Sequence, residues 1–205
     1  METRWIWAAA VLGLLAGGCT TTKQTAPARA ASEQLLLSTA ADRAIARADF
    51  TGFTNKAVFL DPAYFESYDQ KYVLGQIRDA ISQNGAVLAS SASNADIILE
   101  PRSGGLSLDT SSSLLGIPAS GLPVPFAGAV EIPEIALYRS DLEFSIAKFA
   151  LLAYARKEGT HFYSSGPLVG KAYLKNYKII GMISWKRTDV PEEERVKKRH
   201  KHKER

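Results

Sequence analysis

Two stretches of the chain have the apolar spacing of amphipathic helices. Residues 32–48 carry an aliphatic side chain at every fourth position, with charged residues between them. Residues 67–85 show a clearer pattern, in which Val73 begins an apolar face with spacings of four, seven and eight residues. Ser67 and Gln70 predict a capping box at the start of this helix. An Asn-Gly pair, a common helix C-terminus, predicts its end.

Apolar runs around these helices predict strands. The run in residues 145–156 alternates between two sets of side chains, as in a strand that buries one face. Residues 157–160 (Lys-Glu-Gly-Thr) predict the turn of a late β-hairpin. The other predicted strands are residues 56–60, 86–89, 96–100, 135–138 and 161–164, with a less regular continuation over residues 171–181.

Residues 111–133 interrupt this order with three glycines and four prolines. Proline has no amide proton to donate, so this density predicts a long loop rather than a helix or a central strand. If the loop is exposed, its apolar side chains form a patch of the kind that contacts another protein or a membrane. The alternative is a loop that folds over the sheet and covers its core. The candidate interaction residues are Leu114, Leu115, Ile117, Leu122, Val124 and Phe126.

Together these elements predict one α+β domain over residues 33–185. We expect a mixed β-sheet with two or three helices on one face, a long Pro/Gly-rich apolar loop and a late β-hairpin.

The chain begins with the pattern of a secretory signal. A short polar start is followed by an apolar run over residues 5–15 and then by small residues. The run is shorter than the ~20 residues that a spanning helix needs. We therefore expect residues 1–18 to be a signal peptide. Residues 19–32 hold one proline and no aliphatic residue larger than alanine, so we expect them to be a flexible tether. The alternatives are an ordinary secreted protein and a buried core helix.

The sequence Leu15-Ala16-Gly17-Gly18-Cys19 resembles the lipobox of bacterial lipoproteins. That resemblance implies cleavage before Cys19, a diacylglyceryl group on its thiol and acylation of the new amino terminus. Such an anchor holds a protein stably on a membrane. It places the protein in the cell envelope, and Thr20 at the next position implies the outer membrane rather than the inner one.

The positive charge of the chain is concentrated at one end. The net charge is +4, whereas residues 195–205 alone carry +6, so the rest of the chain sums to −2. Residues 186–205 are predicted to be a charged, disordered tail. The tail has no interleaved aromatic residues, so we expect no nucleic-acid partner. The tail either contacts anionic lipid or serves only to keep the protein in solution, and the sequence favours neither role.

The sequence contains no recognisable catalytic constellation. Of its three histidines, His200 and His202 lie in the charged tail and His161 lies beside the predicted hairpin turn. Ser164 and Ser165 are near His161 but are not part of a nucleophile elbow. Cys19 is the single cysteine, so no Cys/His zinc site is available once it is acylated. We expect no enzyme activity, no metal and no cofactor.

The middle of the chain also has a family likeness. The order of Lys56–Asp61, the helix over residues 72–85 and Ala95–Glu100 resembles the α/β domains of TolB-N-terminal and curli-secretion-like envelope lipoproteins, and more distantly TraT-like lipoproteins. Residues 32–181 are similar to an uncharacterised bacterial lipoprotein family that shares Gly116-Ile117-Pro118 and Ser164-Ser165-Gly166-Pro167. No catalytic residue carries over from these families.

The sequence therefore predicts a non-enzymatic, lipid-anchored envelope lipoprotein with a scaffolding or assembly role. Its partners would be the membrane, through Cys19, and either copies of itself, through residues 111–133, or another envelope protein. The alternative is a periplasmic binding module for a small ligand, a lipid or a cell-wall polymer.

Overall fold

The computed structural model describes residues 29–124 and 128–191, and the side chains of residues 29–120 and 133–191. The predicted signal peptide, Cys19 and most of the predicted tether and tail lie outside the described residues.

Six strands form one mixed sheet in the order β2-β1-β3-β6-β7-β8. The short strands β1 and β2 run parallel to each other, β1 runs parallel to β3, and the remaining neighbours are antiparallel. The strands are β1 (Ala57–Leu60), β2 (Val87–Leu88), β3 (Ile97–Ile117), β6 (Ile135–Ala155), β7 (His161–Ile179) and β8 (Ile183–Thr188). Two further strands, β4 (Ser120–Val124) and β5 (Gly128–Ile132), pair only with each other.

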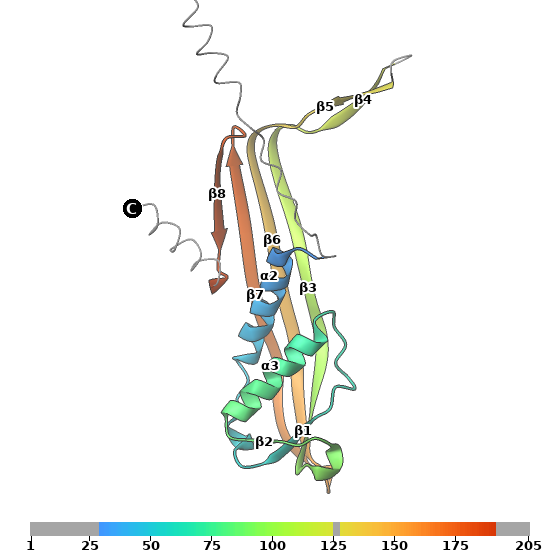
Figure 1. Cartoon of the computed structure of the whole chain (residues 1–205), viewed down its shortest axis with the longest axis vertical. Coiled ribbons are helices and arrows are strands. Elements are labelled where there is room, and N and C mark those ends of the chain that lie inside the picture. Colours follow the sequence, from blue (N-terminus) through green and yellow to red (C-terminus); the bar gives the residue numbers. More distant parts are fainter. Residues whose placement is uncertain (1–28, 125–127, 192–205) are drawn as a thin grey trace, which may run out of the picture. The chain divides into compact units, whose positions relative to one another are not determined.

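Two α-helices, α2 (Ala31–Ile45) and α3 (Gln70–Gln83), lie over the same face of the sheet (Figure 1). Two 3-10 turns, Thr51–Phe53 and Ala92–Asn94, complete the described elements. The prediction of an α+β domain with a mixed sheet, two helices on one face and a late hairpin is therefore confirmed.

Helix α2 packs closely on β6 and β7 because small residues line the contact. Ala40, Ala41 and Ala44 are fully buried on its sheet-facing side. A Cβ atom placed on Gly170 of β7 would lie 1.9 Å from the carbonyl oxygen of Ala40, so only glycine fits under the helix at that point. Nearby, the buried Ser145 hydroxyl of β6 donates a 2.7 Å hydrogen bond to the carbonyl oxygen of Leu36.

Helix α3 buries the apolar face that its sequence predicts, since Val73, Ile77 and Ile81 are inaccessible to solvent. The predicted capping box is wrong. The helix begins at Gln70 with Asp69 in the capping position, so Ser67 lies outside the first turn. Its hydroxyl is buried and makes no hydrogen bond to any described atom. The predicted C-terminus is confirmed, with Asn84 as the last capping residue and Gly85 at φ 81°.

One main core lies between the helices and the sheet, and a smaller cluster around Ile98 lies on the opposite side of the sheet. Near the end of the described chain, Arg43 of α2 donates a 2.6 Å hydrogen bond to the carbonyl oxygen of Asp189 and forms an ion pair with its carboxylate. Val190 is buried beside them in the core. The folded part thus continues past the expected boundary at residue 185.

The expectation of a long loop over residues 111–133 is wrong. Strand β3 continues to Ile117, and β6 is one strand from Ile135 onward instead of two separate ones. Two of the prolines leave these long strands intact because they lie between elements: Pro118 lies between β3 and β4, and Pro133 lies between β5 and β6. Gly116, at φ 151°, occupies an irregularity of the pairing where a Cβ atom would lie 2.1 Å from the carbonyl oxygen of Ile135.

Within the described part of the chain, neither α2 nor α3 combines the length and the apolar content that a membrane-spanning helix requires.

Candidate functional site

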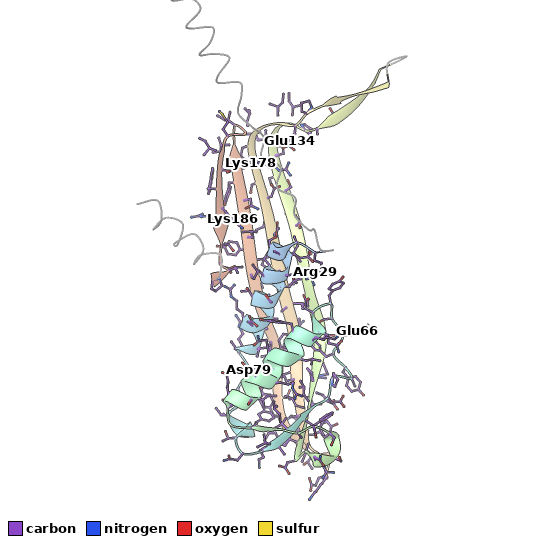
Figure 2. The ribbon with its side chains drawn as sticks, in the orientation of Figure 1. Arg29, Glu66, Asp79, Glu134, Lys178 and Lys186 are labelled. Atoms are coloured by element: carbon purple, nitrogen blue, oxygen red, sulfur yellow. The ribbon has the colours of Figure 1, made fainter. Side chains whose placement is uncertain are left out.

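Strands β3, β6, β7 and β8 continue beyond the part of the sheet that the helices cover (Figure 1). We call this region the distal sheet. It consists of residues 109–117 of β3, 135–144 of β6, 173–179 of β7 and 183–188 of β8. Figure 2 labels Glu134, Lys178 and Lys186 in this region, whereas Glu66 and Asp79 lie near α3.

Strand register assigns each side chain of the distal sheet to one of two faces, because directly paired residues point to the same side. On the helix side, one row runs through Ser112, Asp141, Asn176 and Lys186. The next row runs through Leu114, Arg139, Lys178 and Ser184. We call this side the polar face.

The opposite side, the back face, carries mainly apolar and aromatic side chains. Its rows are Ser111–Leu142–Lys175–Arg187, Ser113–Ser140–Tyr177–Trp185 and Leu115–Tyr138–Ile179–Ile183. Leu174 marks the border of the distal sheet with the main core, and beyond it neither α2 nor α3 extends over these strands (Figure 1). The distal sheet is therefore amphipathic: the aromatic rows lie on the back face, together with Lys175 and Arg187, and the polar face carries mainly polar and charged side chains.

Ion pairs order the polar face. The Arg139 guanidinium contacts Glu134 at 2.7 Å and Asp141 at 2.9 Å, and the Ser112 hydroxyl donates a 2.8 Å hydrogen bond to Asp141. The hydrogen bond from Arg139 lowers the pKa of Asp141 below its ordinary value, and the two carboxylates raise the pKa of Arg139.

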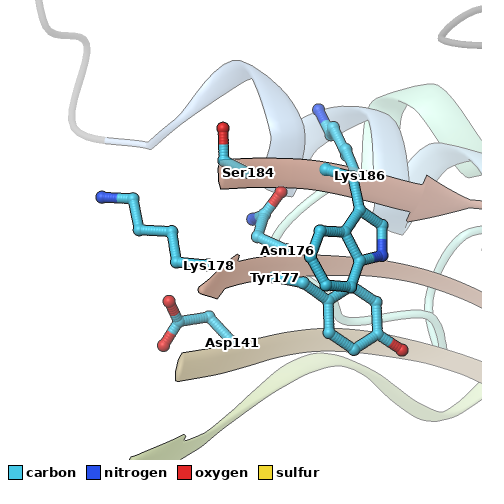
Figure 3. A pocket seen from close by; sticks show the side chains of 7 residues that line it. Asp141, Asn176, Tyr177, Lys178, Ser184 and Lys186 are labelled. Carbon is cyan, nitrogen blue, oxygen red and sulfur yellow. The ribbon is translucent and has the colours of Figure 1, made fainter. Parts of the chain in front are cut away.

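A shallow groove of about 750 Å³ lies beside this network. Asp141, Asn176, Lys178, Ser184 and Lys186 line it from three adjacent strands, as Figure 3 shows. The groove combines the ammonium groups of Lys178 and Lys186 with the carboxylate of Asp141, with neutral donors and acceptors, and with two aromatic rings. Because Asp141 is already paired with Arg139, the two ammonium groups favour a polar or anionic ligand.

An aromatic row crosses the back face to the edge of the sheet. The rings of Tyr138 and Tyr177 have centroids 6.4 Å apart, and those of Tyr177 and Trp185 are stacked at 4.9 Å with an angle of 12°. Lys175 lies over the Tyr177 ring, with its Nζ atom 5.1 Å from the centroid. Trp185 is 41% exposed although it lies in this stack.

The far end of the distal sheet is lined with exposed apolar residues, which we call the apolar end. Leu115 is 64% exposed on β3, and Leu137 is 57% exposed on β6. Seven large apolar side chains near these strand ends are more than half exposed: Leu115, Ile117, Ile135, Leu137, Ile180, Met182 and Ile183. A cluster of this kind marks a contact surface on a soluble domain.

Two of the six predicted interaction residues belong to the apolar end, namely Leu115 and Ile117. Leu114 is half-buried on the helix side of β3. Leu122 and Val124 lie in β4, but their side chains are outside the described set, and Phe126 lies outside the described residues altogether.

The sequence analysis did not identify residues 135–144 and 173–188 as part of a candidate contact surface. The signal was present in Tyr177 and Ile179, which alternate with Asn176 and Lys178 as in a strand with one apolar face. His161 is exposed at the start of β7. Over the ranges that the structure describes, no three His, Cys, Asp or Glu residues are grouped as metal ligands would be.

Comparison with known protein families identifies the family of this chain. No curated protein matches the chain. A family model described as a family of unknown function (DUF6655) matches residues 11–192, which include every strand and helix described above. The chain therefore belongs to this family of unknown function.

Proposed function

We propose that the protein is a non-enzymatic, lipid-anchored component of the cell envelope that assembles through its distal sheet. The single observation that carries the proposal is the apolar end. Seven large apolar side chains are left in solvent at the end of strands whose other half is packed under helices. Burying that surface against another protein would be favourable by about 25 cal/mol per Å² of apolar area.

The anchor in this proposal is Cys19. The apolar leader, the small residues before the cysteine and the absence of any other cysteine in the chain support lipidation there. Thr20 supports sorting to the outer membrane. Anchoring would confine the protein to a surface and so raise its effective concentration for self-association.

A second candidate function rests on the groove of the polar face. Lys178 and Lys186 with Asn176 and Ser184 offer donors to a small anionic ligand or to a charged cell-wall polymer. The groove is shallow, whereas ligand pockets usually enclose most of their ligand. For that reason we place assembly first and the binding module second.

The proposed assembly is tested by the native mass of the full-length lipoprotein in mild detergent. We expect a discrete oligomer for the wild-type protein. A variant with Ile117→Thr, Ile135→Thr and Leu137→Thr should shift to monomer, because threonine keeps the strand propensity while it removes apolar surface. These residues are more than half exposed, so their replacement removes little core packing.

The matched control is Val87→Thr on β2, which is 62% exposed but far from the distal sheet in strand order. It should keep the wild-type mass. A monomeric wild-type protein at all concentrations, or an oligomer that the triple variant leaves unchanged, would contradict assembly through this surface.

A further inference from the structure

Both outer edges of the distal sheet lack a strand partner among the described residues. The segment that follows β1 covers β3 only as far as Ser103, whose amide donates to the carbonyl oxygen of Tyr64 at 3.3 Å. Beyond that point β3 pairs with β6 alone, and β8 pairs with β7 alone. An open edge presents a row of backbone donors and acceptors that another strand can satisfy.

Between its two pairing irregularities, at Ser103/Gly105 and Leu115/Gly116, the β3 edge carries little that would protect an open strand. Residues 104–117 contain one charged residue, Asp109, and neither lysine nor proline. Natural edge strands commonly carry lysine, proline or an inward-pointing charge that prevents pairing with a second molecule. The exposed run Ser111-Ser112-Ser113 has small side chains that leave the backbone accessible.

The two edges run in opposite directions. Successive strands of the distal sheet, β3, β6, β7 and β8, are antiparallel to one another, so β3 and β8 also point in opposite directions. When β8 of one molecule lies against β3 of another in the same orientation, the antiparallel order of the sheet continues without a break. The polar face and the back face then continue into their counterparts.

The side chains of the two edges match in size and polarity when each row of the back face is continued from β8 of one molecule to β3 of the next. Leu115 of β3 is level with Ile183 of β8, and Ser113 is level with Trp185. An apolar residue then meets an apolar residue, and a small serine leaves room for the exposed indole. Arg187 is level with Ser111 and lies diagonal to Asp109, within the reach of a cross-strand ion pair.

The charges of the two strands also have opposite signs. Residues 183–188 carry Lys186 and Arg187 with no acid, whereas residues 104–117 carry Asp109 with no base. This favours pairing of unlike edges over pairing of β3 with β3 or of β8 with β8, because like charges that face each other across strands are destabilising.

We propose that β8 of one copy pairs antiparallel with the free β3 edge of a second copy. The inference rests on the proposed self-association and specifies its contact. The contact is heterologous, since each copy uses two different edges. It leaves one edge of each kind free in a dimer, so it repeats until a ring closes or a chain forms.

Disulfide trapping with the full-length lipoprotein in mild detergent tests this contact. The natural cysteine is Cys19 alone, and the proposed lipid blocks its thiol, so only the introduced cysteines can cross-link. Ser111→Cys and Ser113→Cys each place a thiol on the back face of β3, and Arg187→Cys places one on β8. Paired residues of adjacent strands have Cα atoms about 4.5–5.5 Å apart, within the range of a disulfide. Copper phenanthroline serves as the oxidant.

We expect a covalent dimer when Ser111→Cys is mixed with Arg187→Cys, because these two positions are level with each other in the proposed contact. Ser113→Cys is diagonal to Arg187→Cys, about 7–8 Å away, and should give little product, as should any variant alone. A double variant with both cysteines should give a ladder of covalent multimers. The control is Ser82→Cys on the exposed surface of α3, which should not be trapped by Arg187→Cys. A further variant, Ser113→Lys, adds no cysteine and tests the contact without cross-linking. It should raise the protein concentration at which half of the oligomer dissociates by about fivefold, since it adds a cation opposite the basic β8 strand.

The outcomes separate the contact from the proposed function. Trapping of a β3 variant with itself, or an oligomeric native mass without any trapping between the two edges, overturns the β8–β3 contact while self-association stands. A monomeric native mass without trapping overturns both. Trapping only in the mixture supports both.

Discussion

At the scale of single residues, Gly170 is the clearest case of a position fixed by packing. An added Cβ atom would lie 1.9 Å from the Ala40 carbonyl oxygen and 2.6 Å from the Ala44 amide nitrogen. We therefore predict that Gly170→Ala moves α2 off the sheet and lowers the free energy of unfolding by about 1–3 kcal/mol. Thermal or urea unfolding followed by circular dichroism measures the effect.

The same substitution at Gly75 is the matched control. A Cβ atom there meets nothing within 4 Å, and Gly75 lies in the exposed middle of α3. Gly75→Ala should stabilise the protein by up to about 1 kcal/mol, because alanine has the higher helix propensity. Equal effects of the two substitutions would contradict the close approach of α2 to β7.

The lowered pKa of Asp141 predicts that the stability of the folded protein depends on pH. Its pKa is lowered in the folded protein, mainly by the hydrogen bond from Arg139, so its carboxylate stabilises the folded state at pH values above its unfolded pKa. That contribution is lost as the pH falls below about 4 toward the folded pKa. Asp141→Asn should therefore flatten the pH dependence of the unfolding midpoint below about pH 4.

Asp79→Asn on α3 is the control for the loss of one acidic residue. It should retain more of the wild-type acid dependence than Asp141→Asn does. If Asp141→Asn unfolds with the wild-type dependence, the ion pairs of Arg139 contribute nothing to the stability of the distal sheet.

At the scale of elements, β8 depends on one aromatic contact. It pairs with β7 over six residues and has no strand on its other side among the described residues. The stacking of Trp185 on Tyr177 is worth about 0.5–1.5 kcal/mol beyond area burial. We predict that Trp185→Ala speeds hydrogen exchange of the amides of residues 183–188 about two- to tenfold.

Met182→Ala in the β7–β8 turn is the comparison for this experiment. Met182 is 83% exposed, so its loss should leave the exchange of residues 183–188 near the wild-type rate. Unchanged exchange in Trp185→Ala would show that backbone pairing alone holds β8 on the sheet.

At the scale of the whole molecule, the prediction concerns the anchor. Cys19→Ala should abolish labelling by radioactive palmitate and release the protein from the membrane fraction. Thr20→Ala, at the next position, should still be labelled. Labelling that persists in Cys19→Ala would contradict lipidation at this cysteine and with it the anchored part of the proposed function.

Elements with a strong local pattern were predictable from the sequence. The four-residue period of α2, the apolar face of α3, the Asn-Gly end of that helix and the turn at residues 157–160 all appear where they were expected. Each depends on contacts between residues close in the chain, or on one buried face whose period the side chains reproduce. For the same reason the α+β class could be stated from the order of these patterns.

The distal sheet was decided by the tertiary structure. Residues such as Ser111 and Ser113 have no strand pattern of their own, and they are extended because β6, about thirty residues away in sequence, satisfies their backbone groups. Two of the prolines that predicted a loop, Pro118 and Pro133, lie in gaps between strands, and Pro123 lies within the short strand β4. Strands β3 and β6 continue to this point because Ile117 pairs with Ile135. Local patterns in the sequence were enough to specify the helices and the core strands. The open edges and the amphipathic faces exist only because distant segments pair.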